Sequence, residues 1–156
     1  MKESKGNFEN SILPWLGRTM KMIDYFIADK MKANKMHLSK QQWIVLKVLF
    51  NEDGKPQNDL AFITNRDKGS LARLLNTMES KNLVARIPSK KDRRINEIYL
   101  TKHGEQVLVE SFPVFEEIIN ELEQGLNDTQ IKTVVDVLKK VQNNINVSEL
   151  VAVETK

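Results

Sequence analysis

The stretch from Gln57 to Thr101 contains a particular order of short elements, and this order limits the possible folds more than any other feature. A short apolar segment ends at Ile63, the polar turn Thr64-Asn65-Arg66 follows, and a longer amphipathic segment begins after Asp67. Asp is a favoured N-cap residue, and Asn tolerates the left-handed backbone conformation that a tight turn requires. The pattern therefore predicts two helices joined by a tight turn.

Two short strand-like segments follow the second helix, with a basic loop between them. Asn82 can end the helix in the left-handed conformation, in place of Gly. Leu83 to Ile87 predicts a strand, Ser89 to Arg94 a polar loop, and Ile95 to Leu100 a second strand. Pro88 should end the pairing, because proline cannot donate a backbone hydrogen bond. The pieces together predict a winged helix-turn-helix.

Helical periodicity continues on both sides of this module. A first helix is predicted from about Pro14 to Ala33. Ser39 and Gln42 form a capping-box pattern at the start of the next helix. Thr101 and Asn127 are the predicted caps of the last two helices. The fold class is therefore mainly α, with an α+β wing. The apolar stripes of the outer helices could cover each other or a second copy of the chain.

Composition indicates a single globular domain. The 156 residues are 40% hydrophobic and 29% charged, which is typical of a folded chain with its own core. The sequence contains no run of 18 apolar residues and no signal-peptide pattern at its start. Cysteine is absent, which excludes disulfides and thiolate catalysis by this chain. We expect a cytoplasmic protein.

Charge is unevenly distributed along the chain. Residues 60–105 carry ten Lys or Arg and five acids, a local net charge of +5. Residues 106–156 carry nine acids and four Lys, a local net charge of −5. A basic region on a helix-turn-helix indicates a face for an anionic polymer such as DNA.

The motifs of the central region, taken together, resemble those of the MarR family of bacterial transcriptional regulators. Each motif is short, but all occur in order and at the family's spacing. Asn82 stands where Gly is usual in that family, and Ala72 stands where Ser or Thr is common. The segments that carry the resemblance are Leu60-Ala61, Asp67 to Leu74, Glu79 to Arg86, Asp92-Arg93-Arg94, Leu100-Thr101 and Gly104.

The resemblance implies a homodimer that binds a palindromic operator in double-stranded DNA, often as a repressor released by a ligand. It implies a dimerisation domain formed by the N-terminal helix (1–36) and the C-terminal helices (105–146). The DNA-binding module would be 37–104, and 147–156 would be a tail. An alternative interpretation is a winged-helix interaction module whose basic face binds an acidic partner protein. A third is a small-molecule-binding enzyme on this scaffold.

The DNA-facing residues are predicted from the helical wheel and from the loop. Arg73 can contact a guanine edge or a phosphate, and Asn76 can pair with adenine. Asp92 should hold an arginine instead of meeting DNA, with Arg94 as its favoured partner and Arg93 at the wing tip. The predicted recognition-helix residues are Lys68, Gly69, Ser70, Arg73, Asn76 and Thr77. The predicted wing residues are Lys90, Lys91, Arg93 and Arg94, braced by Asp92 and Arg86.

The sequence predicts no enzyme, no cofactor and no metal site. His37 and His103 are far apart, and no catalytic motif occurs. A pocket for a small, possibly aromatic ligand is predicted near Trp15, Met22, Phe26 and Trp43, although plain core or dimer packing explains each of these residues equally well.

Overall fold

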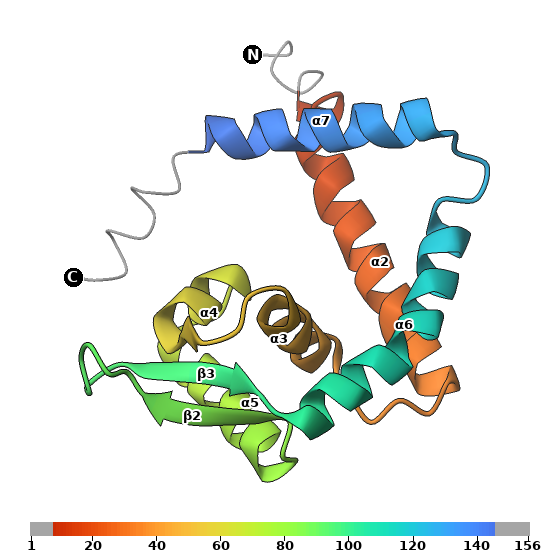
Figure 1. Ribbon diagram of the computed structural model, residues 1–156. Helices are drawn as coiled ribbons and strands as arrows, with labels where there is room; N and C mark the ends of the chain where they lie inside the picture. Colours follow the sequence, from red (N-terminus) through yellow and green to blue (C-terminus); the bar gives the residue numbers. More distant parts are fainter. Residues whose placement is uncertain (1–7, 146–156) are drawn as a thin grey trace. The chain divides into compact units, whose positions relative to one another are not determined.

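The computed structural model describes residues 8–145, so the predicted tail at 147–156 lies outside the described residues. The chain divides into two compact units, residues 1–118 and residues 119–156. The fold is mainly helical with one small sheet, as predicted (Figure 1). The elements are α2 (Ile12–Ala33), α3 (Lys40–Asn51), β1 (Lys55–Pro56), α4 (Gln57–Ile63), α5 (Lys68–Ser80), β2 (Val84–Pro88), β3 (Asn96–Leu100), α6 (Lys102–Leu122) and α7 (Asp128–Asn144).

The predicted helix caps are present. Ser39 Oγ accepts a hydrogen bond from the Gln42 amide, and the Gln42 side chain accepts one from the Ser39 amide. Asn127 forms the same reciprocal pair with Gln130 at the start of α7. These contacts satisfy amide groups that the first turn of a helix leaves without partners.

The left-handed turns also lie where the sequence predicted them. Asn65 has φ +51° between α4 and α5, and Asn82 has φ +55° after α5. The Leu83 amide donates to the Met78 carbonyl across the second turn, a bond typical of a Schellman helix end. The turn at Asn82 therefore leads the chain from α5 into β2.

The sheet has three antiparallel strands in the order β1-β3-β2. Figure 1 shows β2 and β3 as a hairpin. Their pairing ends at Pro88 opposite Asn96, close to the predicted end. The two-residue strand β1 was not predicted, because Pro56 was assigned only to the start of α4. Lys55 pairs with Ile98, far away in sequence, so no local pattern reveals this strand.

The core lies among α3, α4, α5, the sheet and the first half of α6. Leu71, Leu75 and Met78 are buried on the inner face of α5, and Leu74 is half-buried. The other fully buried large side chains are Leu46, Leu49, Leu60, Ile98, Leu108, Ile118 and Val45. The hydrophobic core therefore fixes the recognition helix by one face and leaves the opposite face exposed.

The start of α6 passes very close to the chain that leads into β2. Thr101 Oγ1 accepts a hydrogen bond from the Gly104 amide at 2.9 Å, as predicted for a cap. A Cβ at Gly104 would lie 2.0 Å from the Leu83 carbonyl oxygen. Only glycine fits at this crossing.

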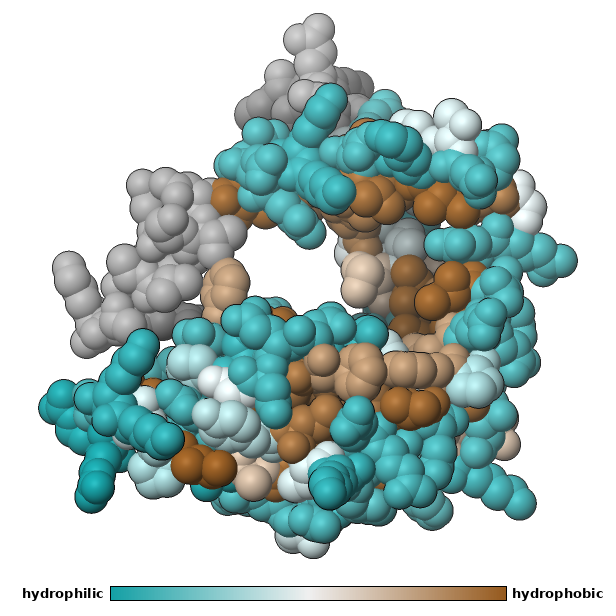
Figure 2. Space-filling view, in the orientation of Figure 1, coloured by the Kyte–Doolittle hydropathy of each residue, from teal (hydrophilic) through white to brown (hydrophobic). Residues whose placement is uncertain are grey.

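The outer helices expose large apolar side chains. α7 buries none of its residues, and Figure 2 shows its apolar side chains along one side and polar ones along the other. No helix in residues 8–145 has the length and apolar character to cross a membrane. The exposed apolar residues of α2 and its start, the end of α6, and α7 include Phe8, Ile12, Leu13, Trp15, Met20, Met22, Tyr25, Ile119, Leu122, Val134, Val135 and Val137.

Candidate nucleic-acid interface

The outer face of α5 carries the predicted recognition residues. Lys68, Gly69, Arg73, Asn76 and Thr77 are exposed, and Ser70 is half-buried. Asp67 caps the helix by accepting a hydrogen bond from the Ser70 amide at 2.8 Å. This bond lowers the pKa of the Asp67 carboxyl from its ordinary value. The helix therefore presents a row of polar side chains on a firmly capped first turn.

Ser70 is held by a residue that was assigned only to the turn. Arg66 Nη1 donates to Ser70 Oγ at 2.6 Å, and this bond occupies one acceptor position of the hydroxyl. The remaining O–H can donate to an acceptor on a ligand. The presence of a basic side chain four residues before Ser70 was the available sequence signal for this contact.

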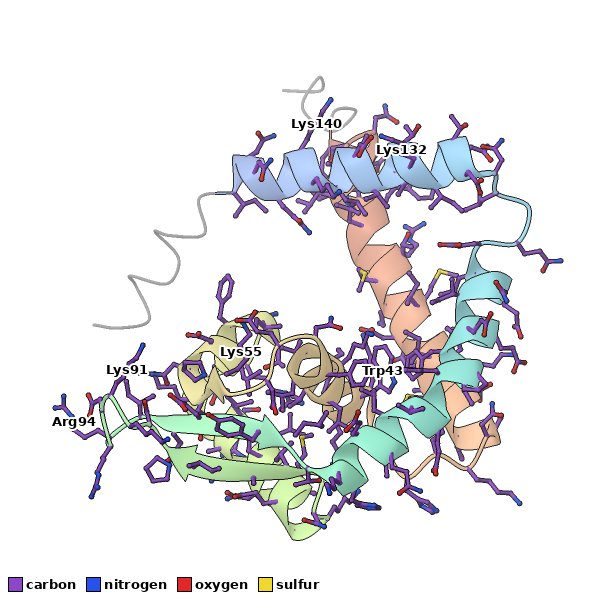
Figure 3. The ribbon with its side chains drawn as sticks, in the orientation of Figure 1. Trp43, Lys55, Lys91, Arg94, Lys132 and Lys140 are labelled. Carbon is purple, nitrogen blue, oxygen red and sulfur yellow. The ribbon has the colours of Figure 1, made fainter. Side chains whose placement is uncertain are left out.

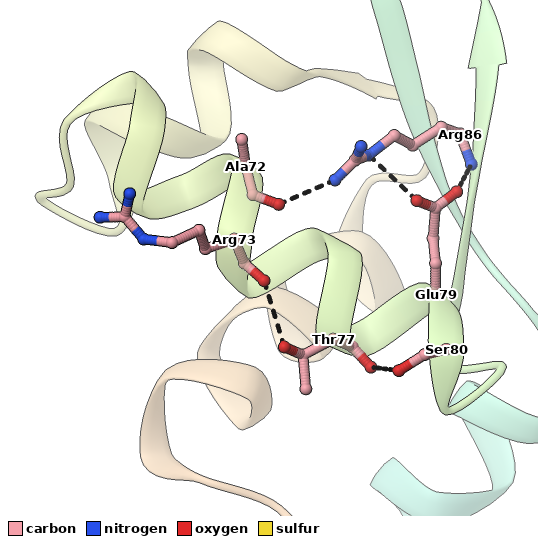
Figure 4. A network of polar contacts seen from close by, with 6 residues as sticks. All are labelled: Ala72, Arg73, Thr77, Glu79, Ser80 and Arg86. Carbon is pink, nitrogen blue, oxygen red and sulfur yellow. Dashed lines mark hydrogen bonds and ion pairs between the residues drawn. The ribbon is translucent and has the colours of Figure 1, made fainter.

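Two recognition residues differ in how far they are committed to the helix itself. Thr77 Oγ1 donates to the Arg73 carbonyl at 3.2 Å, so the Thr77 hydroxyl is engaged with the backbone. The Arg73 side chain extends away from the helix (Figure 4). Arg73 is therefore the better placed of the two to reach a groove.

Arg86 joins β2 to the recognition helix. Its Nη2 donates to the Ala72 carbonyl at 3.0 Å, and its amide donates to Glu79 Oε1 at 3.3 Å (Figure 4). Its Nε lies 3.3 Å from Glu79 Oε2 in an ion pair. The sequence had assigned Arg86 to bracing Asp92, and this partner was wrong. The real partner, Glu79, is on a different element, so sequence spacing could not identify it.

The wing loop is organised around Asp92. Arg94 Nε and Nη2 donate to the two Asp92 oxygens at 3.1 and 2.9 Å, and the Arg94 amide donates to Asp92 Oδ1 at 3.0 Å. The Arg94 side chain lowers the pKa of Asp92, and Asp92 raises the pKa of Arg94. Arg94 was the predicted partner, and its side chain is still 90% exposed.

The tip of the wing is strongly basic. Figure 3 shows Lys91 and Arg94 extending outward from the hairpin loop. Lys90 and Arg93 are also exposed. These four cations surround one acidic residue, Asp92, whose charge Arg94 balances.

A second set of contacts braces the base of the wing and was not predicted. Tyr99 donates its hydroxyl hydrogen to Glu97 Oε2 at 2.8 Å. Hydrogen bonds from the Ser89 and Tyr99 hydroxyls lower the pKa of Glu97. Ser89 is buried, and its Oγ also accepts from the Lys91 amide at 3.3 Å. The loop is therefore held at its base as well as at Asp92.

The four residues predicted for a ligand pocket have different environments. Trp15 is 62% exposed and Met22 is 65% exposed. Trp43 stacks on Phe115 with a ring-centroid distance of 3.7 Å, and Phe26 packs half-buried against the core. In a single chain Trp43 and Phe26 belong to core packing, while Trp15 and Met22 belong to an exposed apolar face.

A cavity of about 570 Å³ lies elsewhere in the first unit, between the α2–α3 connection and α6. None of the four predicted pocket residues lines it. Within residues 8–145 no group of three or more His, Asp or Glu side chains gathers as metal ligands would.

The comparisons agree on one family of proteins. The model of the MarR family matches residues 38–95. The chain is 29% identical over 109 residues to an HTH-type transcriptional regulator, YdgJ, of Bacillus subtilis (strain 168). The aligned part covers 70% of this chain and 66% of YdgJ, just under two thirds of that regulator's length.

Solved structures share the fold over most of the chain. The transcriptional regulator BldR from Sulfolobus solfataricus matches with a TM-score of 0.79 and 22% identity, covering 93% of this chain and all of BldR. The transcriptional repressor CouR, solved bound to a 23-mer DNA duplex, matches with a TM-score of 0.77 and 19% identity, covering 88% and 96%.

Proposed function

Because the chain belongs to the MarR family of transcriptional regulators, we propose that it binds a palindromic DNA operator as a homodimer and represses transcription until a ligand releases it. The observation that carries this proposal is the exposed face of α5 beside a basic wing. Arg73 extends from the helix, and Lys91 and Arg94 extend from the wing (Figures 3 and 4). A protein that acts on operators works where DNA is, so the proposed location is the cytoplasm.

The recognition helix would enter the major groove, which is wide enough for one helix. Arg73 would donate to a guanine edge or to a phosphate, and Asn76 would pair with adenine. Ser70, held by Arg66, would donate its hydrogen to a phosphate or to a base acceptor. Gly69 has no side chain, so the DNA backbone could approach α5 closely there.

The wing would lie along the adjacent minor groove. Narrow minor grooves attract arginine through their negative potential. Arg94 is oriented by Asp92, and Arg93 has no such partner among the contacts of the described residues. Arg93 would therefore enter the groove, while Arg94 would hold the loop. Lys90 and Lys91 would add phosphate contacts that do not depend on base sequence.

Dimerisation is supported by the exposed apolar faces of α2 and α7. Side chains such as Trp15, Met22 and Val134 are more than half exposed in the single chain. Monomeric proteins rarely expose large contiguous apolar patches. A second copy would cover these faces and present two recognition helices about one DNA turn, roughly 34 Å, apart.

Selection from a random DNA library tests the proposal. The purified full-length protein should enrich a two-fold symmetric site, and its affinity for that site should fall steeply with salt. An enriched site without symmetry would contradict the dimeric reading. No enrichment, together with tight binding to an acidic protein, would replace the regulator by the interaction module considered from the sequence.

Ligand control can be tested on the same site. A ligand releases the protein only if it binds better to the conformation with incorrectly spaced recognition helices. A compound that lowers operator affinity should therefore bind more weakly when operator DNA is present, by the same factor. Unequal factors at equilibrium would exclude this mechanism.

A further inference from the structure

We propose that the cavity between the α2–α3 connection and α6 binds an aliphatic carboxylate, which is the effector of the regulator. Its volume is about 570 Å³. It is distinct from the pocket predicted around Trp15, Met22, Phe26 and Trp43, none of which lines it. The effector role rests on the proposed function, but binding at the cavity does not.

The apolar part of the lining is aliphatic. Leu38 and Leu83 are buried, and Val107 and Val114 are half-buried. The only rings in the lining are the imidazoles of two histidines. A flexible hydrocarbon chain would contact these branched side chains well, and no aromatic side chain is present for an aromatic ligand to stack on.

The polar part of the lining favours an anion. Lys35, His37, Lys81 and His103 surround the cavity and can all donate hydrogen bonds. Glu110 is the one acidic side chain in the lining, and its carboxylate already accepts a hydrogen bond from Gln106 Nε2 at 2.9 Å. A carboxylate would find several donors at the rim, whereas an alcohol or an amine would lose the charge attraction.

Lys35 provides a second observation. It has φ +53° at the end of α2, a conformation that glycine adopts without strain and lysine does not. The Met36 amide donates to the Met31 carbonyl across this turn, so the turn itself would form with glycine. The lysine side chain, which lines the cavity, is therefore not explained by the backbone.

The cavity also reaches the end of the recognition helix. Lys81 is the C-cap residue of α5, and its Nζ donates to the His37 carbonyl at 3.1 Å. A carboxylate bound to Lys81 would compete with this contact. The ligand would thus act on the connection between the recognition helix and the turn after α2.

Trp43 offers a reporter for occupancy. Its Nε1 donates to Ser111 Oγ at 2.8 Å, and Ser111 lines the cavity. Decanoate added to the full-length protein without DNA should shift the indole N–H resonance of Trp43 in a saturable manner. The indole resonance of Trp15, on an exposed face, is the internal control. Decan-1-ol should bind at least about tenfold more weakly, because it lacks the charge.

Two variants separate binding from folding. Lys81→Gln and Lys35→Gly should each weaken decanoate binding several-fold, and Lys35→Gly should also raise the melting temperature because it relieves the left-handed lysine. Lys102→Gln, on α6 but outside the lining, should leave the affinity unchanged.

The proposal is overturned if Trp43 shows no saturable shift, if decan-1-ol binds as well as decanoate, or if both lysine variants bind like the parent. Operator affinity with and without decanoate is then measured separately. Decanoate binding with no change in operator affinity would remove the effector role and leave the ligand site. Failure of the library selection would concern the DNA function alone.

Discussion

At Gly104 a single hydrogen atom in place of a side chain allows two segments to cross. An added Cβ would lie 2.0 Å from the Leu83 carbonyl oxygen, so the backbone would have to shift. We expect Gly104→Ala to lower the free energy of unfolding by about 1–3 kcal/mol, measured by urea denaturation. Gly69→Ala is the matched control, because its Cβ would meet only an ordinary contact at 3.4 Å. A Gly104→Ala variant as stable as the Gly69→Ala variant would contradict the crossing.

Arg73 is the residue on which sequence discrimination should depend most. Arg73→Ala should weaken operator binding by about 1–3 kcal/mol while changing affinity for random DNA less. Mobility shifts on the two DNAs over a range of salt concentrations measure both effects. Arg18→Ala, on α2, is the control and should leave operator affinity unchanged. An equal loss on both DNAs would reassign Arg73 to a phosphate contact.

The residues that could be predicted are those whose role depends on near neighbours. Asp67 and Asn127 were identified as caps because a cap and its amide are three residues apart. Asn82 was identified because left-handed φ values favour Asn after Gly. The Arg86–Glu79 pair was missed, because the choice between Glu79 and Asp92 depends on how β2 packs against α5.

At the scale of elements, the wing is a hairpin whose loop is held by one ion pair. Asp92→Asn would release Arg94 and remove a negative charge from the loop. We expect the ratio of operator to random-DNA affinity to fall several-fold, while random-DNA affinity stays equal or rises because the loop is more positive. Competition binding with both DNAs measures the ratio. An unchanged ratio would show that the Asp92–Arg94 pair does not orient the wing.

The stability of the DNA-binding module should fall in acid for an identifiable reason. The pKa values of Asp67, Asp92 and Glu97 are lowered in the folded protein by the Ser70 amide, the Arg94 side chain and the Ser89 hydroxyl respectively. The folded state therefore binds fewer protons than the unfolded state near the ordinary carboxyl pKa values. The stabilisation is present above those values and is lost as pH falls through the lowered ones.

We expect the free energy of unfolding to change little between about pH 7 and pH 5 and to decrease below about pH 4. Denaturation at a series of pH values measures the slope. Asp67→Asn should reduce the slope, because Asn still caps the helix but does not titrate. An identical slope in that variant would exclude Asp67 as a contributor.

Which elements could be predicted follows the same physical distinction. Periodicity and caps identify helices, so α3, α4 and α5 were predicted with nearly their observed bounds. β1 depends on pairing Lys55 with Ile98, and no periodic pattern exists in two residues. The cavity at the end of α2 was also missed, because its walls come from segments far apart in sequence.

At the scale of the whole molecule, the exposed apolar faces indicate a partner of the same chain. Val134 lies on the apolar side of α7 and is 55% exposed. Figure 3 shows Lys132 and Lys140 on the same side of α7, opposite the apolar side seen in Figure 2. Apolar periodicity predicted these faces, but periodicity identifies a face to be covered and not the molecule that covers it.

Val134→Glu should therefore dissociate the dimer and leave the DNA-binding module folded. We expect the dimer dissociation constant to rise by about 100-fold or more, equivalent to about 2.7 kcal/mol, measured by analytical ultracentrifugation. Lys140→Glu is the control on the polar side and should not change it. Retention of a tight dimer in Val134→Glu would exclude the apolar face of α7 from the interface.

The two faces of α5 have separate tasks, and this separation affects how such a regulator can evolve. Leu71, Leu75 and Met78 stabilise the fold, whereas Arg73 and Asn76 are exposed and do not contribute to the core. Substitutions on the outer face can therefore accumulate at little cost to folding. After gene duplication, two copies could acquire different operators while both retain the same scaffold.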